Sequence, residues 1–208
     1  MQEYHYSARL YDPLLSHWIH PIRSRISAIV KRNEYHHILD VCCGTGAQLK
    51  ILKEEGFEGK GIDLSDAMLE VAGRGPVVAD CIQGDATDML FRDQSFDLVS
   101  ITFALHEKNR QSAQKIIEEM LRLTMVGGDI IIVDYDLSDR SSKLYKTLIY
   151  LIERIAGGEH YRNFIAYMKY GGLPTLLAEA DLKELHRYYF GGKSVVLLHL
   201  RKMAQRDQ

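Results

Sequence analysis

Acidic residues and glycines follow two apolar segments in the first third of the chain, in a pattern that suits a nucleotide-binding site. Asp40 lies in the apolar run 38–41, and Gly44 and Gly46 come just after it. Glycines at the start of a helix let backbone N–H groups approach a ligand that any Cβ would keep away. Asp63 ends the next apolar segment, 17 positions after Gly46, which is about the distance at which an acidic residue binds ribose hydroxyls in Rossmann-like folds.

A histidine and a glutamate, His106 and Glu107, are the second candidates for chemistry. They follow the apolar segment 95–101, which is expected to be a strand. Ligands in open parallel α/β sheets bind beyond the carboxyl ends of the strands, so the pair would lie at the reacting end. An imidazole near its ordinary pKa can relay a proton or hydrogen-bond a substrate hydroxyl. The alternative is structural, with His106 capping a loop and Glu107 beginning the next helix.

The elements that must position these residues alternate between short apolar runs and helical stretches. We expect strands over 38–41, 59–63, 77–83, 95–101 and 129–134, and helices after the glycine turn, over 66–72 and over 113–124. A helical insert over 140–180, divided by glycine pairs, precedes a β-hairpin formed by 182–190 and 195–200. The alternation predicts an α/β fold with a mostly parallel sheet.

The segment before the first strand is expected to be helical. Asp12 and Pro13 are typical of a helix N-cap followed by a first-turn proline, and an apolar stripe from Leu14 to Val30 continues the pattern. Pro21 is expected to kink this helix or split it in two.

Two common nucleotide motifs are absent from the glycine turn. A dinucleotide fingerprint needs a glycine where Leu49 stands, and no Gly-Lys-Ser/Thr follows to make a P-loop. Instead, residues 40–46, Asp-Val-Cys-Cys-Gly-Thr-Gly, resemble the first motif of the class I S-adenosylmethionine (SAM)-dependent methyltransferases, with Cys42 in place of a glycine. The same motif is similar to that of some quinone C-methyltransferases of the ubiquinone/menaquinone group. Residues 95–101 resemble the family's Phe-Asp-x-Val segment, and the resemblance is firm over 36–135.

This resemblance implies a Rossmann-like, seven-stranded, mostly parallel sheet with helices on both faces and an antiparallel last strand. It implies SAM as the cofactor, with Asp63 on the ribose hydroxyls and Asp85 on the adenine amine. Tyr11, in the segment that commonly covers the donor, is a further candidate contact. The cofactor-binding residues that it implies are Tyr11, Asp40, Cys42, Gly44, Gly46, Asp63, Leu64, Met68, Asp85, Ala86, Thr102 and Phe103. No universal catalytic residue is implied, and His106 and Glu107 are the catalytic candidates.

The expected organisation is one domain over residues 1–208, with four parts. These are an N-terminal helical cap (1–35), a SAM-binding core (36–135), a helical insert (140–180) and a C-terminal hairpin (182–201). The insert could be a lid, a homodimer face or both.

Composition and charge disfavour several other classes of protein. With 26 basic and 28 acidic side chains, the chain has no expected general attraction to nucleic acid or to an anionic membrane. No apolar run approaches the ~18 residues of a transmembrane helix, so no membrane insertion is expected. Three cysteines without a spaced framework indicate reduced thiols and predict a cytoplasmic protein. The pairs His17/His20 and His36/His37 lack companions at metal-ligand spacing, so no metal site is predicted.

The predicted function is methyl transfer from SAM to a small or medium organic acceptor in an aromatic-lined pocket. A catalytically idle SAM-binding or partner subunit, an NAD oxidoreductase and, as a specific substrate, quinone C-methylation are the alternatives. RNA or protein methylation is disfavoured because residues 101–104, Ile-Thr-Phe-Ala, stand where amino-group methylases have an Asn-Pro-Pro-Tyr type motif. The quinone reading is weakened because residues 160–164 do not follow that family's pattern.

Overall fold

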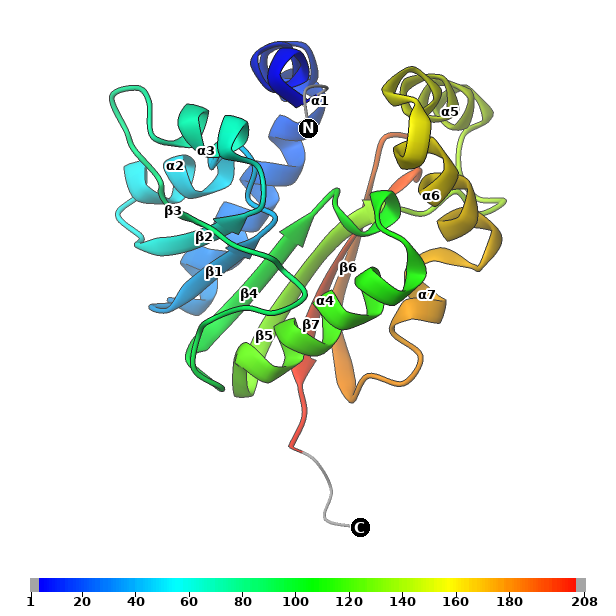
Figure 1. The fold of residues 1–208 in the computed structure, drawn as a ribbon. Helices are drawn as coiled ribbons and strands as arrows, with labels where there is room; N and C mark the ends of the chain where they lie inside the picture. The colour runs from blue at the N-terminus through cyan, green and yellow to red at the C-terminus, as the bar shows by residue number, and fades with distance from the viewer. Residues whose placement is uncertain (1–3, 205–208) are drawn as a thin grey trace.

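Seven strands form one sheet in the order β3-β2-β1-β4-β5-β7-β6 in the computed structural model, which describes residues 4–204 and the side chains of residues 19–204 (Figure 1). The strands are β1 (Ile38–Val41), β2 (Gly59–Asp63), β3 (Asp80–Gln83), β4 (Phe96–Thr102), β5 (Thr124–Tyr135), β6 (Leu182–Phe190) and β7 (Val195–Lys202). Strands β1 to β5 pair in parallel, and β7 pairs antiparallel with both β5 and β6. The predicted α/β fold with an antiparallel last strand is confirmed.

Helices cover both faces of this sheet. They are α1 (Tyr4–Asn33), α2 (Ala47–Glu54), α3 (Asp66–Ala72), α4 (Arg110–Leu123), α5 (Lys143–Ala156), α6 (Gly158–Lys169) and α7 (Gly172–Leu176), and the 3-10 turn η1 (Leu105–Glu107) follows β4. Strand β5 shows how the two layers are built, because its alternate side chains point to opposite faces. Ile131 and Val133 pack with α1 and α2, whereas Ile130 and Ile132 pack with α4, α6 and α7.

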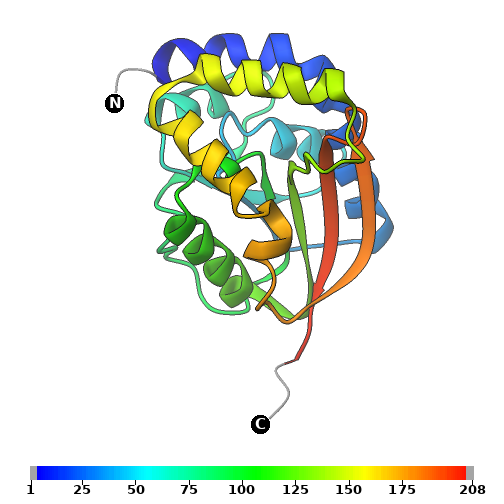
Figure 2. The ribbon, with the colours of Figure 1, turned by 90° about the vertical axis from the view of Figure 1, so that its right-hand side faces the viewer.

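The helical insert lies at the carboxyl edge of the parallel strands. Figure 2 shows α5 running across this edge, with α6 and α7 descending along one face. Gly157 and Gly171, both with positive φ, separate the three helices, as the glycine pairs predicted. No helix among residues 4–204 is long and apolar enough to cross a membrane.

Several predicted boundaries differ from the structure, including the start of the third strand, which is Asp80 and not residue 77. Asp12 is not a helix N-cap, because α1 already begins by Tyr4, and Pro21 does not split the helix. Pro21 is exposed while Ile22 and Ile26 are buried, so the helix keeps its packed face beyond the proline. Strand β5 begins at Thr124 rather than at Asp129, since Thr124 is already extended and the register shifts between Phe96 and Leu98 of β4.

Candidate active site

The turn between β1 and α2 depends on its glycines. Gly44 and Gly46 have φ of +55° and +67°, in the left-handed region. A Cβ on Gly46 would lie 2.6 Å from the Cβ of Ala79, so Gly46 is also a packing requirement. A Cβ on Gly44 would meet no protein atom within 4 Å, so the space beside this residue is open to a ligand.

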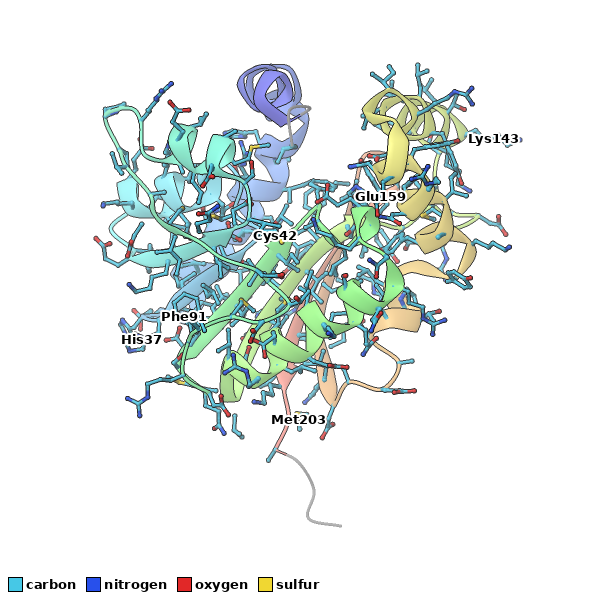
Figure 3. All side chains as sticks on the ribbon, in the orientation of Figure 1. His37, Cys42, Phe91, Lys143, Glu159 and Met203 are labelled. Carbon is cyan, nitrogen blue, oxygen red and sulfur yellow. The ribbon has the colours of Figure 1, made fainter. Side chains whose placement is uncertain are left out.

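Two residues with side chains share this unusual backbone at the carboxyl ends of neighbouring strands. Cys42, just after β1, has φ of +53°, and Phe103, just after β4, has φ of +54°. Non-glycine residues in this region carry conformational strain, which collects at functional sites. At Cys42 the conformation explains why the related family has a glycine at this position. Figure 3 shows Cys42 toward the same edge of the sheet as Glu159 of α6, and His37 and Met203 toward the opposite edge.

Asp63, the last residue of β2, faces the glycine turn across the sheet edge. Its Oδ2 accepts a hydrogen bond from the backbone N–H of Gly44 at 2.8 Å, and its Oδ1 accepts one from that of Ser65 at 2.9 Å. The carboxylate is partly buried, and each oxygen keeps a lone pair for a further donor. The arrangement fits a pair of ribose hydroxyls.

Asp40 differs from Asp63 in its surroundings. Its side chain is buried, and Oδ1 accepts a 2.7 Å hydrogen bond from the Ser100 hydroxyl of β4. Burial raises the pKa of Asp40 to about 6, against the lowering effects of Ser100 and Arg23. Asp40 therefore lies below the turn rather than at its surface.

The remaining predicted cofactor residues line the ends of β2, β3 and β4. Leu64 is exposed and Met68 partly buried in α3, whose first turn is capped by Ser65. Asp85 is exposed, and hydrogen bonds from the backbone and hydroxyl of Thr87 lower its pKa. Ala86 is buried, and Thr102 is partly buried at the end of β4. The side chain of Tyr11 lies outside the described residues.

His106 is buried in η1, with only 3% of its surface exposed. Its Nδ1 and a carboxylate oxygen of Asp134 are 2.7 Å apart, and the backbone N–H groups of Leu105 and His106 donate to the other oxygen. Burial acts to lower the pKa of His106, but the Asp134, Glu153 and Glu107 carboxylates raise it above its ordinary value. The imidazole is thus held within a carboxylate-rich core instead of facing open solvent.

Glu107 belongs to the same network through the helical insert. Its Oε2 lies 3.3 Å from Nδ1 of His160, and its Oε1 lies 2.6 Å from the Lys108 ammonium. Burial acts to raise the pKa of Glu107, but hydrogen bonds from His160 and Lys108 lower it to about 2. Hydrogen bonds to Glu107 and Glu153 in turn raise the pKa of His160 to about 9.

The sequence identified two members of this network and missed the others. The sequence predicts Asp134 only as the end of a strand at the site edge, and it places Glu153 and His160 only in a helical insert. Glu153 and His160 are separated from His106 by more than 40 positions. No sequence signal marks Glu153, because its burial, at 2% exposure, arises from tertiary packing.

Comparison with known proteins agrees with this geometry. A family model described as a methyltransferase domain matches residues 38–128. A demethylmenaquinone methyltransferase of Renibacterium salmoninarum is 29% identical over 180 residues, which make up 75% of this chain and 75% of that protein. Residues 38–128 therefore form a class I SAM-dependent methyltransferase domain. The family resemblance of the glycine turn and of β4 is confirmed, as is SAM as the methyl donor of the domain.

Other relatives of this methyltransferase domain match over shorter stretches. The demethylmenaquinone methyltransferase of Paenarthrobacter aurescens is 38% identical over 98 residues, 47% of this chain and 38% of that protein. That of Clavibacter sepedonicus is 34% identical over 139 residues, 61% of this chain and 56% of that protein. The chain therefore spans between about two fifths and three quarters of the length of these relatives.

Solved structures of low identity share the fold. Magnesium protoporphyrin IX methyltransferase from Synechocystis, with S-adenosylhomocysteine bound, has a TM-score of 0.62 at 15% identity and covers 88% of this chain and 82% of its own. An O-methyltransferase family protein from Burkholderia thailandensis has a TM-score of 0.71 at 16% identity, covering 96% of this chain and 60% of its own. These likenesses establish the methyltransferase fold alone.

Proposed function

We propose that the chain transfers the methyl group of SAM to a small or medium organic acceptor at the carboxyl edge of the sheet. The observation that carries the proposal is the Asp63 carboxylate, which is fixed by the N–H groups of Gly44 and Ser65 beside open space at the glycine turn. We assign Asp63 to the ribose hydroxyls and exposed Asp85 to the adenine amine. A site of intact carboxylates also argues against the catalytically idle alternative.

The chain's task in such a reaction is mainly one of placement. SAM, held by Asp63 and the glycine turn, would supply a methyl group on a positively charged sulfur. The acceptor atom would bond to the methyl carbon as the carbon–sulfur bond breaks and S-adenosylhomocysteine leaves, and the acceptor's proton would pass to solvent. Aligning the reacting groups and excluding water lowers the barrier by several kcal/mol without a dedicated catalytic side chain. The His106 network, beyond β4 and β5, is the part of the chain that we assign to the acceptor.

An apolar groove supports an acceptor of this size. It has a volume of about 470 Å³ and a mostly apolar lining from β6, β7 and α7 and from Met168 and Tyr135. The charged Asp136, Glu184 and Arg187 also line it. Small-molecule pockets commonly have volumes of ~300–1,000 Å³ and mostly apolar linings. Tyr135 joins the groove to the His106 network, since the centroids of the two rings are 4.6 Å apart.

A quinol is the second, more specific candidate for the acceptor. It is favoured by the relatives, which are described as demethylmenaquinone methyltransferases. Because the helical insert does not follow the pattern of the quinone family, the quinol stays the second candidate, and a 1,4-naphthoquinol is the acceptor with which to test it.

Calorimetric titration with SAM, with S-adenosylhomocysteine and, as a control, with NAD tests the proposal. We expect micromolar binding of the first two and none of NAD. Failure of both adenosyl ligands to bind would leave an idle fold or a site that needs a partner, and the proposed function would be refuted.

We also propose a cellular location and an oligomeric state for the chain. Three free cysteines support a cytoplasmic location. A homodimer stays a prediction, and the exposed Leu144, Leu151 and Ile155 of α5 are the residues to probe by light scattering of charged variants.

A further inference from the structure

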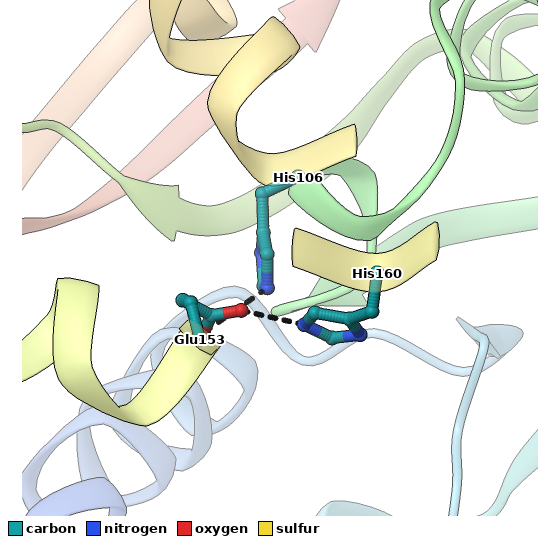
Figure 4. A group of neighbouring side chains, drawn as sticks. All are labelled: His106, Glu153 and His160. Atoms are coloured by element: carbon teal, nitrogen blue, oxygen red, sulfur yellow. Dashed lines mark hydrogen bonds and ion pairs between the residues drawn. The ribbon is translucent and has the colours of Figure 1, made fainter. Parts of the chain in front are cut away.

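Three potential metal ligands from three different elements converge beside the end of β5. His106 of η1, Glu153 of α5 and His160 of α6 each offer a nitrogen or oxygen atom, and these atoms lie within 4.8 Å of one another. Figure 4 shows both imidazole rings directed at the Glu153 carboxylate. The distances are 3.7 Å from His106 Nε2 to Oε1 and 2.5 Å from His160 Nε2 to Oε2.

The outer ring nitrogens of both histidines are held by other carboxylates. Nδ1 of His106 lies 2.7 Å from Asp134, and Nδ1 of His160 lies 3.3 Å from Glu107. Histidines that bind metals commonly donate their second N–H to a carboxylate, which fixes the tautomer and aims the ligating nitrogen. Here this arrangement occurs twice and leaves both Nε2 atoms facing the same carboxylate.

The oxygen ligand is oriented as well. The Tyr135 hydroxyl donates a 2.7 Å hydrogen bond to Oε1 of Glu153. Glu153 is 2% exposed and His106 3% exposed, whereas the His160 side chain is 23% exposed. The cluster is thus hydrogen-bonded and largely buried, and His160 is its most exposed member.

The charge of the cluster also suits a divalent cation. With neutral imidazoles, the carboxylates of Asp134, Glu153 and Glu107 face one ammonium, that of Lys108. The other two negative charges are balanced either by protons on the two imidazoles or by a divalent cation, because buried charge is costly unless it is paired or coordinates a metal. Protonation of both imidazoles would reach the same balance without an ion, and this is the competing outcome of the test.

We propose that His106, Glu153 and His160 bind a divalent transition-metal ion, with Zn²⁺ as the ion that the donor set favours. Two imidazole nitrogens and one carboxylate oxygen are a known zinc ligand set, in which three protein ligands leave one coordination position open. Metal binding follows from the cluster alone. The assignment of the open position to an oxygen of the methyl acceptor rests on the proposed function, and in that arrangement His106 orients the acceptor through the ion.

The test is zinc binding by the full chain, stripped of metal with a chelator and titrated against a chromophoric competitor. We expect one Zn²⁺ per chain with a dissociation constant below about 1 µM. His160→Ala should weaken binding at least ~100-fold, and Asp134→Asn, which replaces the carboxylate that orients His106 and accepts the N–H groups of η1, by ~10–100-fold. His36→Ala, which removes an exposed histidine at the start of β1, should bind as the wild type does.

A spectroscopic measurement on the wild-type chain tests the metal site without relying on a variant that could fail to fold. Cobalt(II) added to the wild-type chain should give the visible absorption of a four-coordinate ion, and Zn²⁺ should abolish it. The metal site would be refuted if Zn²⁺ bound no more tightly than to solvent-exposed histidines, or if His160→Ala left the affinity for Zn²⁺ unchanged. The cluster would then be a salt-bridged network with protonated imidazoles.

Parallel titration with SAM separates this inference from the proposed function. SAM binding without zinc binding would refute the metal site and leave methyl transfer in place. Zinc binding without SAM binding would support the metal site and refute the proposed function.

Discussion

At the scale of single residues, two aspartates on the neighbouring strands β1 and β2 have different roles. Asp63 is partly exposed and fixed by two backbone N–H groups, so its free lone pairs suit neutral hydroxyl donors. Asp40 is buried beside Ser100, and its raised pKa reflects desolvation. The two carboxylates therefore divide into a ligand-binding group and a group that supports the turn.

The first prediction concerns Asp63. Asp63→Asn should weaken SAM and S-adenosylhomocysteine binding by ~10–100-fold, because hydrogen bonds to a charged acceptor contribute about 1.5–3 kcal/mol each. Calorimetry measures the loss, and Asp66→Asn, an exposed carboxylate in the first turn of α3, is the matched control. Unchanged affinity in Asp63→Asn would exclude this carboxylate from the cofactor site.

The second prediction concerns His106. His106→Gln can still donate a hydrogen bond to Asp134, so it avoids leaving a buried carboxylate unpaired. Turnover of a 1,4-naphthoquinol, or of the acceptor found by screening, should fall by ~10²–10⁴ if His106 relays a proton or orients the acceptor. SAM affinity should not change. Full turnover in His106→Gln would assign the residue a structural role only.

At the scale of elements, the turn between β1 and α2 combines packing and access. Gly46 is packed against Ala79 beneath the turn, whereas Gly44 borders open space. Both glycines have a left-handed backbone, so they differ only in the atoms that a Cβ at each position would contact.

The third prediction uses this pair of glycines. Gly46→Ala should lower the free energy of unfolding by ~2–4 kcal/mol, since strain and steric overlap add together. Gly44→Ala should cost ~1–2 kcal/mol, the strain alone, but should weaken SAM binding at least ~10-fold. Urea unfolding and calorimetry measure the two effects. Equal stability losses with unaltered SAM binding in Gly44→Ala would contradict the assignment of the turn to the cofactor.

At the scale of the whole molecule, a buried network in the middle of β5 ties the segment after α1 to the sheet. The Asp129 carboxylate accepts hydrogen bonds from the Tyr35 hydroxyl, from His199 at 2.8 Å and from Arg201 at 2.8 Å. Burial acts to raise the pKa of Asp129, but these partners lower it to about 2. Strand β7 and the N-terminal segment are thus joined through one charged group, far along the sequence from both.

The fourth prediction is a pH dependence of stability. Because the folded pKa of Asp129 lies below its unfolded value near 3.8, its stabilisation is complete above pH ~4 and is lost as the pH falls toward 2. The loss should amount to about 2 kcal/mol, and Asp129→Asn should remove that part of the slope. Urea unfolding between pH 2 and 5 measures it, with Asp139→Asn, an exposed carboxylate, as control. An identical acid slope in Asp129→Asn and wild type would contradict the prediction.

The sequence by itself determined the layered fold and the cofactor side of the site. Strand-sized apolar runs, the glycine turn and Asp63 are local signals, because the glycine conformations and the position after a strand follow from near neighbours in the chain. Tertiary structure alone decided the other side. Asp134, Glu153 and His160 surround His106 because η1, β5, α5 and α6 pack at one edge of the sheet. These residues lie more than 25 positions from His106 in the chain, so their burial beside it leaves no periodic pattern in the sequence. Strand β5 likewise extends back to Thr124 because Thr124 pairs with Phe96 of β4, which overrides the local preference of the two glycines that follow.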